Sequence, residues 1–120
     1  VFGDDYLTDD GTCVRDYLHV MDLAEAHVAA LKSINVSMQE NVRAYNLGTG
    51  NGTSVLEVIE EFENATGKKV PYRIGPRRDG DIVAIWANPS RAEKELMWKA
   101  SRTIGDALSD AWRWQVKLDS

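Results

Sequence analysis

The pattern of apolar and polar positions predicts helices separated by short extended segments. Apolar residues recur at the spacing of an amphipathic helix in the segments 22–34, 54–66, 88–98 and 103–115. Short apolar or alternating runs, which are typical of strands, occupy residues 14–20, 42–47, 70–74 and 82–86. This order favours an α/β fold with about four helices and roughly three to four short strands, too few for a complete doubly wound sheet.

Local signals at the helix ends support these boundaries. Side chains that can accept from the free N–H groups of a first turn stand at Asp22, Ser54, Asn88 and Thr103. Ser54 and Glu57 have the spacing of a capping box, and Gly67 is the natural stop of the helix that follows them. His27 falls on the apolar stripe of the first helix, which predicts a buried, hydrogen-bonded histidine rather than a catalytic one.

The totals fit one domain over residues 1–120 and argue against several classes of function. The chain is 43% hydrophobic and 28% charged, and its net charge of −5 disfavours a general nucleic-acid surface. No apolar run approaches the roughly eighteen residues that a membrane span needs. Cys13 is the only cysteine, which excludes an internal disulfide and predicts a buried thiol. The chain begins at Val1 without a signal-peptide pattern, and we expect it to be a piece of a longer protein.

Several kinds of catalytic or cofactor site are missing from the sequence. Two histidines and one cysteine make no metal-ligand cluster, and no serine lies in a Gly-x-Ser-x-Gly turn. No tyrosine is followed four residues later by lysine, the pairing that lowers a tyrosine pKa in some dehydrogenases. The glycine-rich turn at 48–54 has Thr53 in place of the third glycine of a dinucleotide fingerprint. We expect a structural turn there, although the helix N-terminus behind it offers N–H groups to an anion.

The residues most suggestive of ligand binding form the loop at 76–81, which reads Pro-Arg-Arg-Asp-Gly-Asp. Two adjacent guanidinium groups match phosphate oxygens, and a carboxylate can accept hydrogen bonds from sugar hydroxyls. Together these features indicate a nucleotide. A solvated loop whose arginine and aspartate side chains pair with each other explains the same residues equally well.

Four segments together resemble one family of nucleotide-sugar enzymes. They are residues 2–6 (Phe-Gly-Asp-Asp-Tyr), 10–24 (Asp-Gly-Thr-Cys-Val-Arg-Asp-Tyr-Leu-His-Val-Met-Asp-Leu-Ala), 45–50 (Tyr-Asn-Leu-Gly-Thr-Gly) and 76–81. With residues 86–90 and 112–115, the resemblance covers the whole chain. It is to the C-terminal part of the UDP-glucose 4-epimerases, which are extended short-chain dehydrogenases/reductases. The family implies a small substrate-binding domain that is incomplete without an N-terminal Rossmann part, which carries the NAD loop and the catalytic tyrosine and lysine.

The resemblance also implies an activity and a set of binding residues. The whole enzyme, in galactose metabolism, interconverts UDP-glucose and UDP-galactose by transient hydride transfer to bound NAD. It is expected to be a cytoplasmic homodimer without nucleic-acid or membrane partners, and this chain alone is expected to be inactive. Arg15 and Arg78 would hold the diphosphate, and Asp81 would hold the ribose hydroxyls. The backbone at Phe2 would contact uracil, and Tyr17 would line the nucleotide site.

Three other positions follow from the same resemblance. Arg77 is expected to be a structural partner rather than a phosphate ligand. Cys13 stands where glycine is usual in the family, which would put a thiol near the diphosphate. Ile85 occupies the position whose side-chain size gates N-acetylated sugars, and its intermediate size predicts intermediate acceptance of them.

Other functions stay open at this point. One is a related nucleotide-sugar dehydratase, decarboxylase or other epimerase. Another is a stand-alone, non-catalytic module that binds a UDP-sugar or a partner. The resemblance also places residues 44–47 beside the sheet of the nucleotide-binding part, so the chain by itself is expected to be marginally stable or to associate.

Overall fold

The computed structural model describes residues 1–34 and 42–120 and has an α/β architecture. In chain order its elements are β1 (Val14–Arg15), α1 (Val20–Ser33), β2 (Thr53–Ser54), α2 (Val55–Thr66), α3 (Ser90–Leu96) and α4 (Ile104–Leu118). Each of the four predicted helices is therefore present, which confirms the helical part of the fold predicted from the sequence.

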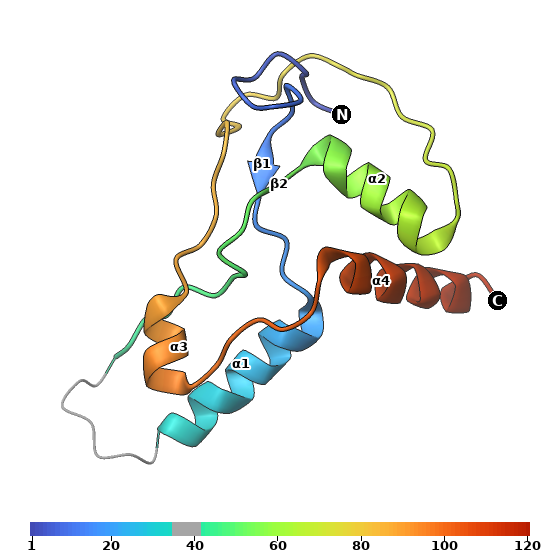
Figure 1. Ribbon diagram of the computed structural model, residues 1–120. Coiled ribbons are helices and arrows are strands. Elements are labelled where there is room, and N and C mark those ends of the chain that lie inside the picture. The colour runs from blue at the N-terminus through green and yellow to red at the C-terminus, as the bar shows by residue number, and fades with distance from the viewer. Residues whose placement is uncertain (35–41) are drawn as a thin grey trace.

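A short spine of extended chain runs through the middle of the molecule, centred on β1 (Figure 1). β1 pairs antiparallel with β2 in the register Val14↔Ser54 and Arg15↔Thr53. On its other side Val14 forms an isolated parallel bridge with Ala84, and Phe2 forms another with Gly75. The spine thus brings together three regions that are far apart in the sequence, residues 2–15, 53–54 and 75–84.

The predicted strands were mostly wrong in length or in kind. The strand expected at 14–20 covers only Val14–Arg15, and α1 already begins at Val20. The runs at 42–47, 70–74 and 82–86 contain no strand in the described part of the chain, and the last contributes only the bridge at Ala84. A strand needs a neighbour for its backbone N–H and C=O groups, and these runs find no continuous one among the described residues.

The helix ends follow the local signals in two cases and depart from them in two. Capping boxes begin α2 at Ser54 and α4 at Thr103, and Gly67 ends α2 with a φ of 69°. The predicted cap at Asp22 was wrong: His19 caps α1, accepting from the Met21 N–H, while Asp22 lies in the first turn. The start predicted at Asn88 was also wrong, because Pro89 occupies the N-cap position of α3.

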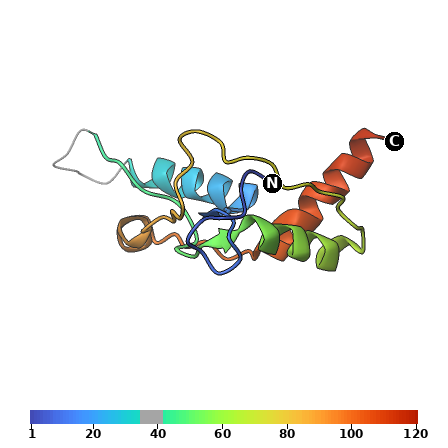
Figure 2. The same cartoon turned by 90° about the horizontal axis from the view of Figure 1, so that it is seen from above.

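The helices form two pairs on opposite sides of the spine. α2 and α4 lie side by side in both views, where the Phe62 and Trp112 rings meet edge to face with centroids 5.6 Å apart (Figures 1 and 2). α1 and α3 pack around a small apolar core of Ala26, Ala92, Leu96 and Trp98. Burial of these side chains, with that of the partly covered residues around them, stabilises each pair.

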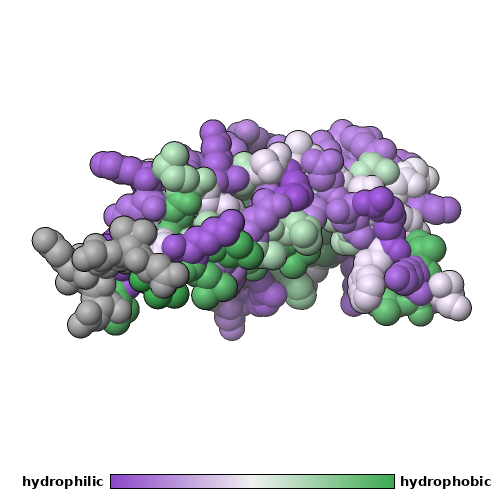
Figure 3. All heavy atoms as spheres, turned by 90° about the horizontal axis from the view of Figure 1, so that it is seen from below, coloured by the Kyte–Doolittle hydropathy of each residue, from purple (hydrophilic) through white to green (hydrophobic). Residues whose placement is uncertain are grey.

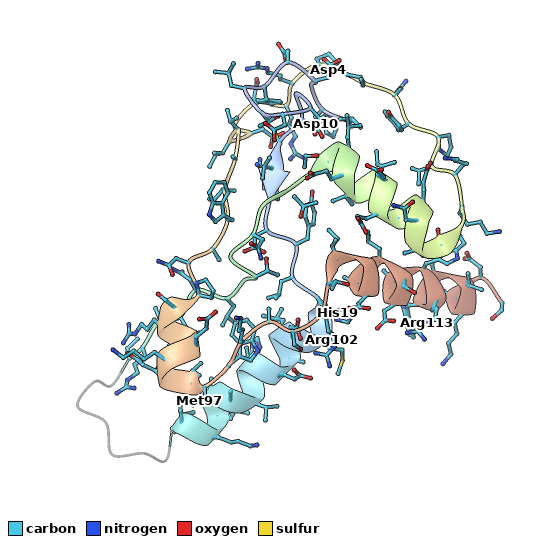
Figure 4. All side chains as sticks on the ribbon, in the orientation of Figure 1. Asp4, Asp10, His19, Met97, Arg102 and Arg113 are labelled. Carbon is cyan, nitrogen blue, oxygen red and sulfur yellow. The ribbon has the colours of Figure 1, made fainter. Side chains whose placement is uncertain are left out.

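A polar joint connects the two pairs. Asp22 on α1 is fully buried, and its carboxylate accepts from the Arg102 guanidinium and from the backbone N–H groups of Ser101 and Arg102. Arg102 also pairs with Glu25 at 2.8 Å. His19 lies close to Arg102 in Figure 4, and its Nε2 is 3.2 Å from Asp110 on α4. The sequence predicted none of these contacts, since its capping interpretation assigned Asp22 to the helix end.

The chain is elongated and leaves much apolar surface uncovered. Its radius of gyration is 17.2 Å, against about 14 Å for a compact domain of this length. Val20, Leu31 and Met97 are among the exposed large apolar residues, and Figure 3 shows hydrophobic patches between hydrophilic side chains on one face. These observations agree with marginal stability or association of the isolated chain, which stays a prediction.

Two single-residue expectations have opposite outcomes. Cys13 is buried, as predicted. His27 is hydrogen bonded, with Nδ1 2.8 Å from the Leu23 carbonyl oxygen, but it is exposed rather than buried. Its stripe of α1 is only partly covered by the other described elements, which is why the burial prediction was wrong. No helix of the described residues has the length and apolar character to cross a membrane.

Candidate functional site

Two arginines from distant parts of the chain converge on one carboxylate at the 76–81 loop. The Arg78 Nη2 atom lies 2.8 Å from Asp81 Oδ1, and Arg15 Nη2 lies 3.7 Å from the same oxygen. The Asp81 side chain is 13% exposed, whereas that of Arg78 is 62% exposed. The arginine–aspartate pair that a solvated loop would show is present. Arg15, however, joins it from β1, and the site therefore carries one more positive charge than negative.

Hydrogen bonds hold the segment that directly follows this loop against β1. The Val14 N–H donates to the Val83 carbonyl at 3.0 Å, and the Ile85 N–H donates to the Val14 carbonyl at 3.1 Å. Arg15 Nη1 also donates to the Ile82 carbonyl at 2.7 Å. Arg15 is therefore anchored at one nitrogen, and its Nη2 side faces Asp81.

The N-terminal segment closes the other side of the site. Phe2 bridges to Gly75, with the Gly3 N–H donating to the Gly75 carbonyl at 2.9 Å. The Arg78 guanidinium carbon lies 5.1 Å from the centroid of the Phe2 ring, which is within cation–π range. The structure thus brings together four of the residues that the family resemblance selected: Phe2, Arg15, Arg78 and Asp81.

Arg77 points to different partners, as expected for a structural residue. Its Nε atom donates to Asp5 Oδ1 at 2.7 Å, and its guanidinium carbon lies 4.2 Å from the centroid of the Tyr6 ring. The hydrogen bond from Arg77 lowers the pKa of the Asp5 carboxyl below its usual value. The two adjacent arginines of the loop therefore have separate surroundings.

Ile85 lines a groove that continues from Arg15. The groove has a volume of about 550 Å³, and its lining includes Arg15, Asp16, Tyr45, Ile85 and Asn88. Tyr17 has no such contact with the site: within the described residues no hydrogen bond or ion pair joins it to Arg78 or Asp81. Burial raises the pKa of the Tyr17 hydroxyl, against the opposing effect of the Arg15 charge. The structure therefore groups Ile85 with Arg15, and Tyr17 is not among the residues that line this groove.

Asp16 is a residue of this region that the sequence analysis missed. Its carboxylate accepts from the backbone N–H groups of Thr49, Gly50 and Ala87 and from the Thr49 hydroxyl. A signal was present, because the predicted strand placed Asp16 on the same side as Val14 and Leu18. A charged residue on an apolar side is rarely buried without partners.

The glycine-rich turn has structural contacts, as expected, and three of its N–H groups, those of Thr49, Gly50 and Asn51, already have acceptors. Those of Thr49 and Gly50 donate to Asp16. Behind the turn, the first turn of α2 is also supplied with acceptors: the Glu57 N–H donates to Ser54, and the Leu56 N–H to Thr12. The anion site left open by the sequence therefore finds no free N–H groups among these donors.

Comparisons with known proteins agree with this arrangement of segments. The chain is 56% identical to a UDP-glucose 4-epimerase of Erwinia amylovora, over 96% of this chain and 34% of the relative. A crystal structure of UDP-glucose 4-epimerase from Bifidobacterium longum, in complex with NAD+ and UDP, matches with a TM-score of 0.90 at 56% identity, over 98% of this chain and 34% of that chain. A UDP-glucose 4-epimerase from Stenotrophomonas maltophila, with bound NAD and formylated UDP-arabinopyranose, matches with a TM-score of 0.94 at 53% identity, over 99% of this chain and 35% of that one.

The chain thus spans about a third of the length of these relatives. A family described as GDP-mannose 4,6 dehydratase matches residues 1–111, which is most of the sequence and includes each segment of the candidate site. This chain belongs to that family.

Proposed function

We propose that this chain is the UDP-sugar-binding part of a UDP-glucose 4-epimerase, an NAD-dependent isomerase that interconverts UDP-glucose and UDP-galactose. The convergence of Arg15 and Arg78 on Asp81, beside the exposed Phe2 ring, carries this proposal. Relatives that are more than half identical over nearly the whole chain are UDP-glucose 4-epimerases, and one of the similar structures holds UDP.

Each residue of the cluster has a role that its chemistry suits. Arg78 is exposed and carries a fork of donors that fits phosphate oxygens, and Arg15 adds a second charge from β1. When a diphosphate draws Arg78 away, Asp81 is released to accept from ribose hydroxyls. The backbone beside Phe2 would meet the base, and Tyr17 would border the nucleotide from one side.

NAD belongs to the whole enzyme in this proposal and is held by residues outside this chain. The glycine-rich turn does not fit a dinucleotide, because its Thr49 and Gly50 N–H groups donate to Asp16. We therefore assign no cofactor contact and no hydride step to the residues of this chain. The whole enzyme would be a cytoplasmic homodimer, whereas this chain alone would bind without catalysing.

The first test is a calorimetric titration of UDP into the chain. We expect a dissociation constant on the order of micromolar, and Arg78→Ala is expected to weaken binding about 10- to 100-fold, because a charge-assisted phosphate contact is lost. Arg113→Ala, which removes an exposed arginine of α4 far from the site, is the matched control and should leave affinity unchanged.

A parallel titration with GDP separates the two enzyme candidates. Tighter binding of GDP than of UDP would favour a GDP-sugar dehydratase, the activity named in the family description. Absence of UDP binding by a chain whose circular dichroism shows folded helices would contradict the proposal.

The second test of this site changes the size of the side chain at position 85. Ile85 lines the groove that leads from Arg15, so we propose that its side chain limits the size of the sugar that the groove accepts. Ile85→Tyr is expected to weaken binding of UDP-N-acetylglucosamine about tenfold more than that of UDP-glucose, because the larger ring fills space that the acetyl group needs. Titration of both sugars into both proteins measures this ratio, and an unchanged ratio would remove Ile85 from specificity.

A further inference from the structure

We propose that Asp16 is a positioning residue of the nucleotide-sugar site, which fixes the groove between Arg15 and Ile85 without touching the ligand. This inference rests on the proposed function. Asp16 lies directly after Arg15, and its carboxylate reaches two other segments: the turn at 48–50 and the chain at Ala87. Ala87 lines the same groove as Arg15, and the turn directly follows Leu47, which also lines it.

Hydrogen-bond donors of the protein occupy both oxygens of the Asp16 carboxylate. Oδ1 accepts from the Thr49 hydroxyl at 2.6 Å, and the Thr49 N–H is shared between Oδ1 and Oδ2 at 3.0 Å from each. Oδ2 accepts from the Gly50 N–H at 3.0 Å and the Ala87 N–H at 3.2 Å. A carboxylate has about four lone-pair positions, and these four donors occupy them.

Because its lone-pair positions are occupied, the Asp16 carboxylate is suited neither to accept from a sugar hydroxyl nor to exchange a proton. Partial burial acts to raise the pKa of Asp16, but the hydrogen bonds from Thr49, Gly50 and Ala87 outweigh it and hold the pKa below its usual value. Asp16 therefore stays ionised, with no lone pair left for a sugar hydroxyl and little tendency to take up a proton. A clamp between backbone segments is the role that its geometry supports.

Gly48, Ala87 and the Asp16 carboxylate are tightly packed against one another. A Cβ atom added at Gly48 would lie 2.5 Å from the Ala87 Cβ and 2.5 Å from Asp16 Oδ2, so the turn and the 87 segment are in direct contact. Ile85 stands two residues before Ala87 and donates its N–H to Val14, which precedes Arg15. A change in the position of Ala87 is therefore transmitted to Ile85 on one wall of the groove and to β1 on the other.

The test compares Asp16→Ala and Asp16→Asn in the full 120-residue chain. In Asp16→Ala, amide hydrogen exchange at Thr49, Gly50 and Ala87 is expected to rise at least about tenfold, because all three N–H groups lose their acceptor. The NMR shift of the Ile85 δ-methyl group should change, and affinity for UDP-glucose should fall about tenfold. Asp16→Asn keeps one acceptor oxygen and can donate to the Thr49 hydroxyl, so it should restore most of the affinity.

Asp10→Ala is the matched control. Asp10 is another clamping carboxylate, which accepts from the N–H and hydroxyl of Thr12 and from the Ser54 hydroxyl, but it does not line the groove. Its loss should disturb the start of α2 and leave the Ile85 methyl shift and the UDP-glucose affinity unchanged.

Each outcome decides one point. Unchanged exchange at Thr49, Gly50 and Ala87 in Asp16→Ala would overturn the clamp. Faster exchange with an unmoved Ile85 methyl signal would overturn positioning, as would an equal loss of affinity in Asp10→Ala. If the unchanged chain does not bind UDP-glucose at all, the proposed function fails, while the Ile85 signal still decides whether Asp16 positions the groove.

Discussion

Replacing Asp22 by alanine is expected to lower the free energy of unfolding by about 3 kcal/mol, because a buried carboxylate with several donors is removed. Ser101 and Arg102 would keep buried or half-buried N–H groups without their acceptor. The Arg102 guanidinium would retain only Glu25 of its two carboxylate partners. The loss falls on the joint between α1 and the start of α4.

Urea unfolding followed by circular dichroism measures this change. Asp79→Ala, which removes an exposed carboxylate from the 76–81 loop, is the control and should stay within about 0.5 kcal/mol of the unchanged chain. If Asp22→Ala were no less stable than Asp79→Ala, the joint would contribute nothing to folding.

The second large effect is expected at Gly11, in the loop that leads to β1. Gly11 has a φ of 81°, and a Cβ atom there would overlap the carbonyl oxygen of Asp4. Alanine therefore meets both an unfavourable backbone conformation and a backbone collision that no side-chain rotation relieves. We expect Gly11→Ala to cost at least about 2 kcal/mol of unfolding free energy.

Gly67→Ala separates these two causes. Gly67 ends α2 with a φ of 69°, but nothing lies within 4 Å of an added Cβ atom. Its cost should therefore be only about 1 kcal/mol, the cost of the left-handed conformation. Thermal unfolding of both variants gives the comparison, and equal losses would mean that the contact with Asp4 does not matter.

What the sequence predicted well depends on residues close together in the chain. The capping box at Ser54 and the helix start at Thr103 need only a residue three positions away, and both formed as expected. The helices follow for the same reason, since their apolar spacing is a local property. Strand pairing depends on distant partners, which explains why the run at 42–47 was predicted as a strand and is not one.

At the candidate site, too, local features were predicted and contacts between distant segments were not. The loop at 76–81 was visible as a group of charged residues, but its local pattern did not distinguish a nucleotide site from a solvated loop. Only the family resemblance connected it with Arg15, and the structure places the two side by side at Asp81. The roles of Asp16 and Asp22 were not predicted, because their partners lie in other segments of the chain.

The polar joint has a consequence for the behaviour of the molecule in acid. The pKa of Asp22 is lowered, because hydrogen bonds from Arg102 and Ser101 outweigh the effect of burial. That of Asp110 is lowered by hydrogen bonds from Arg113, on the same helix, and from His19, across the joint. A lowered pKa gives stability that is complete above the unfolded value and is lost as the pH falls through the folded value. The apolar contacts within each helix pair contain no such group. Acidification would therefore weaken the joint between the two pairs more directly than the apolar contacts within each pair.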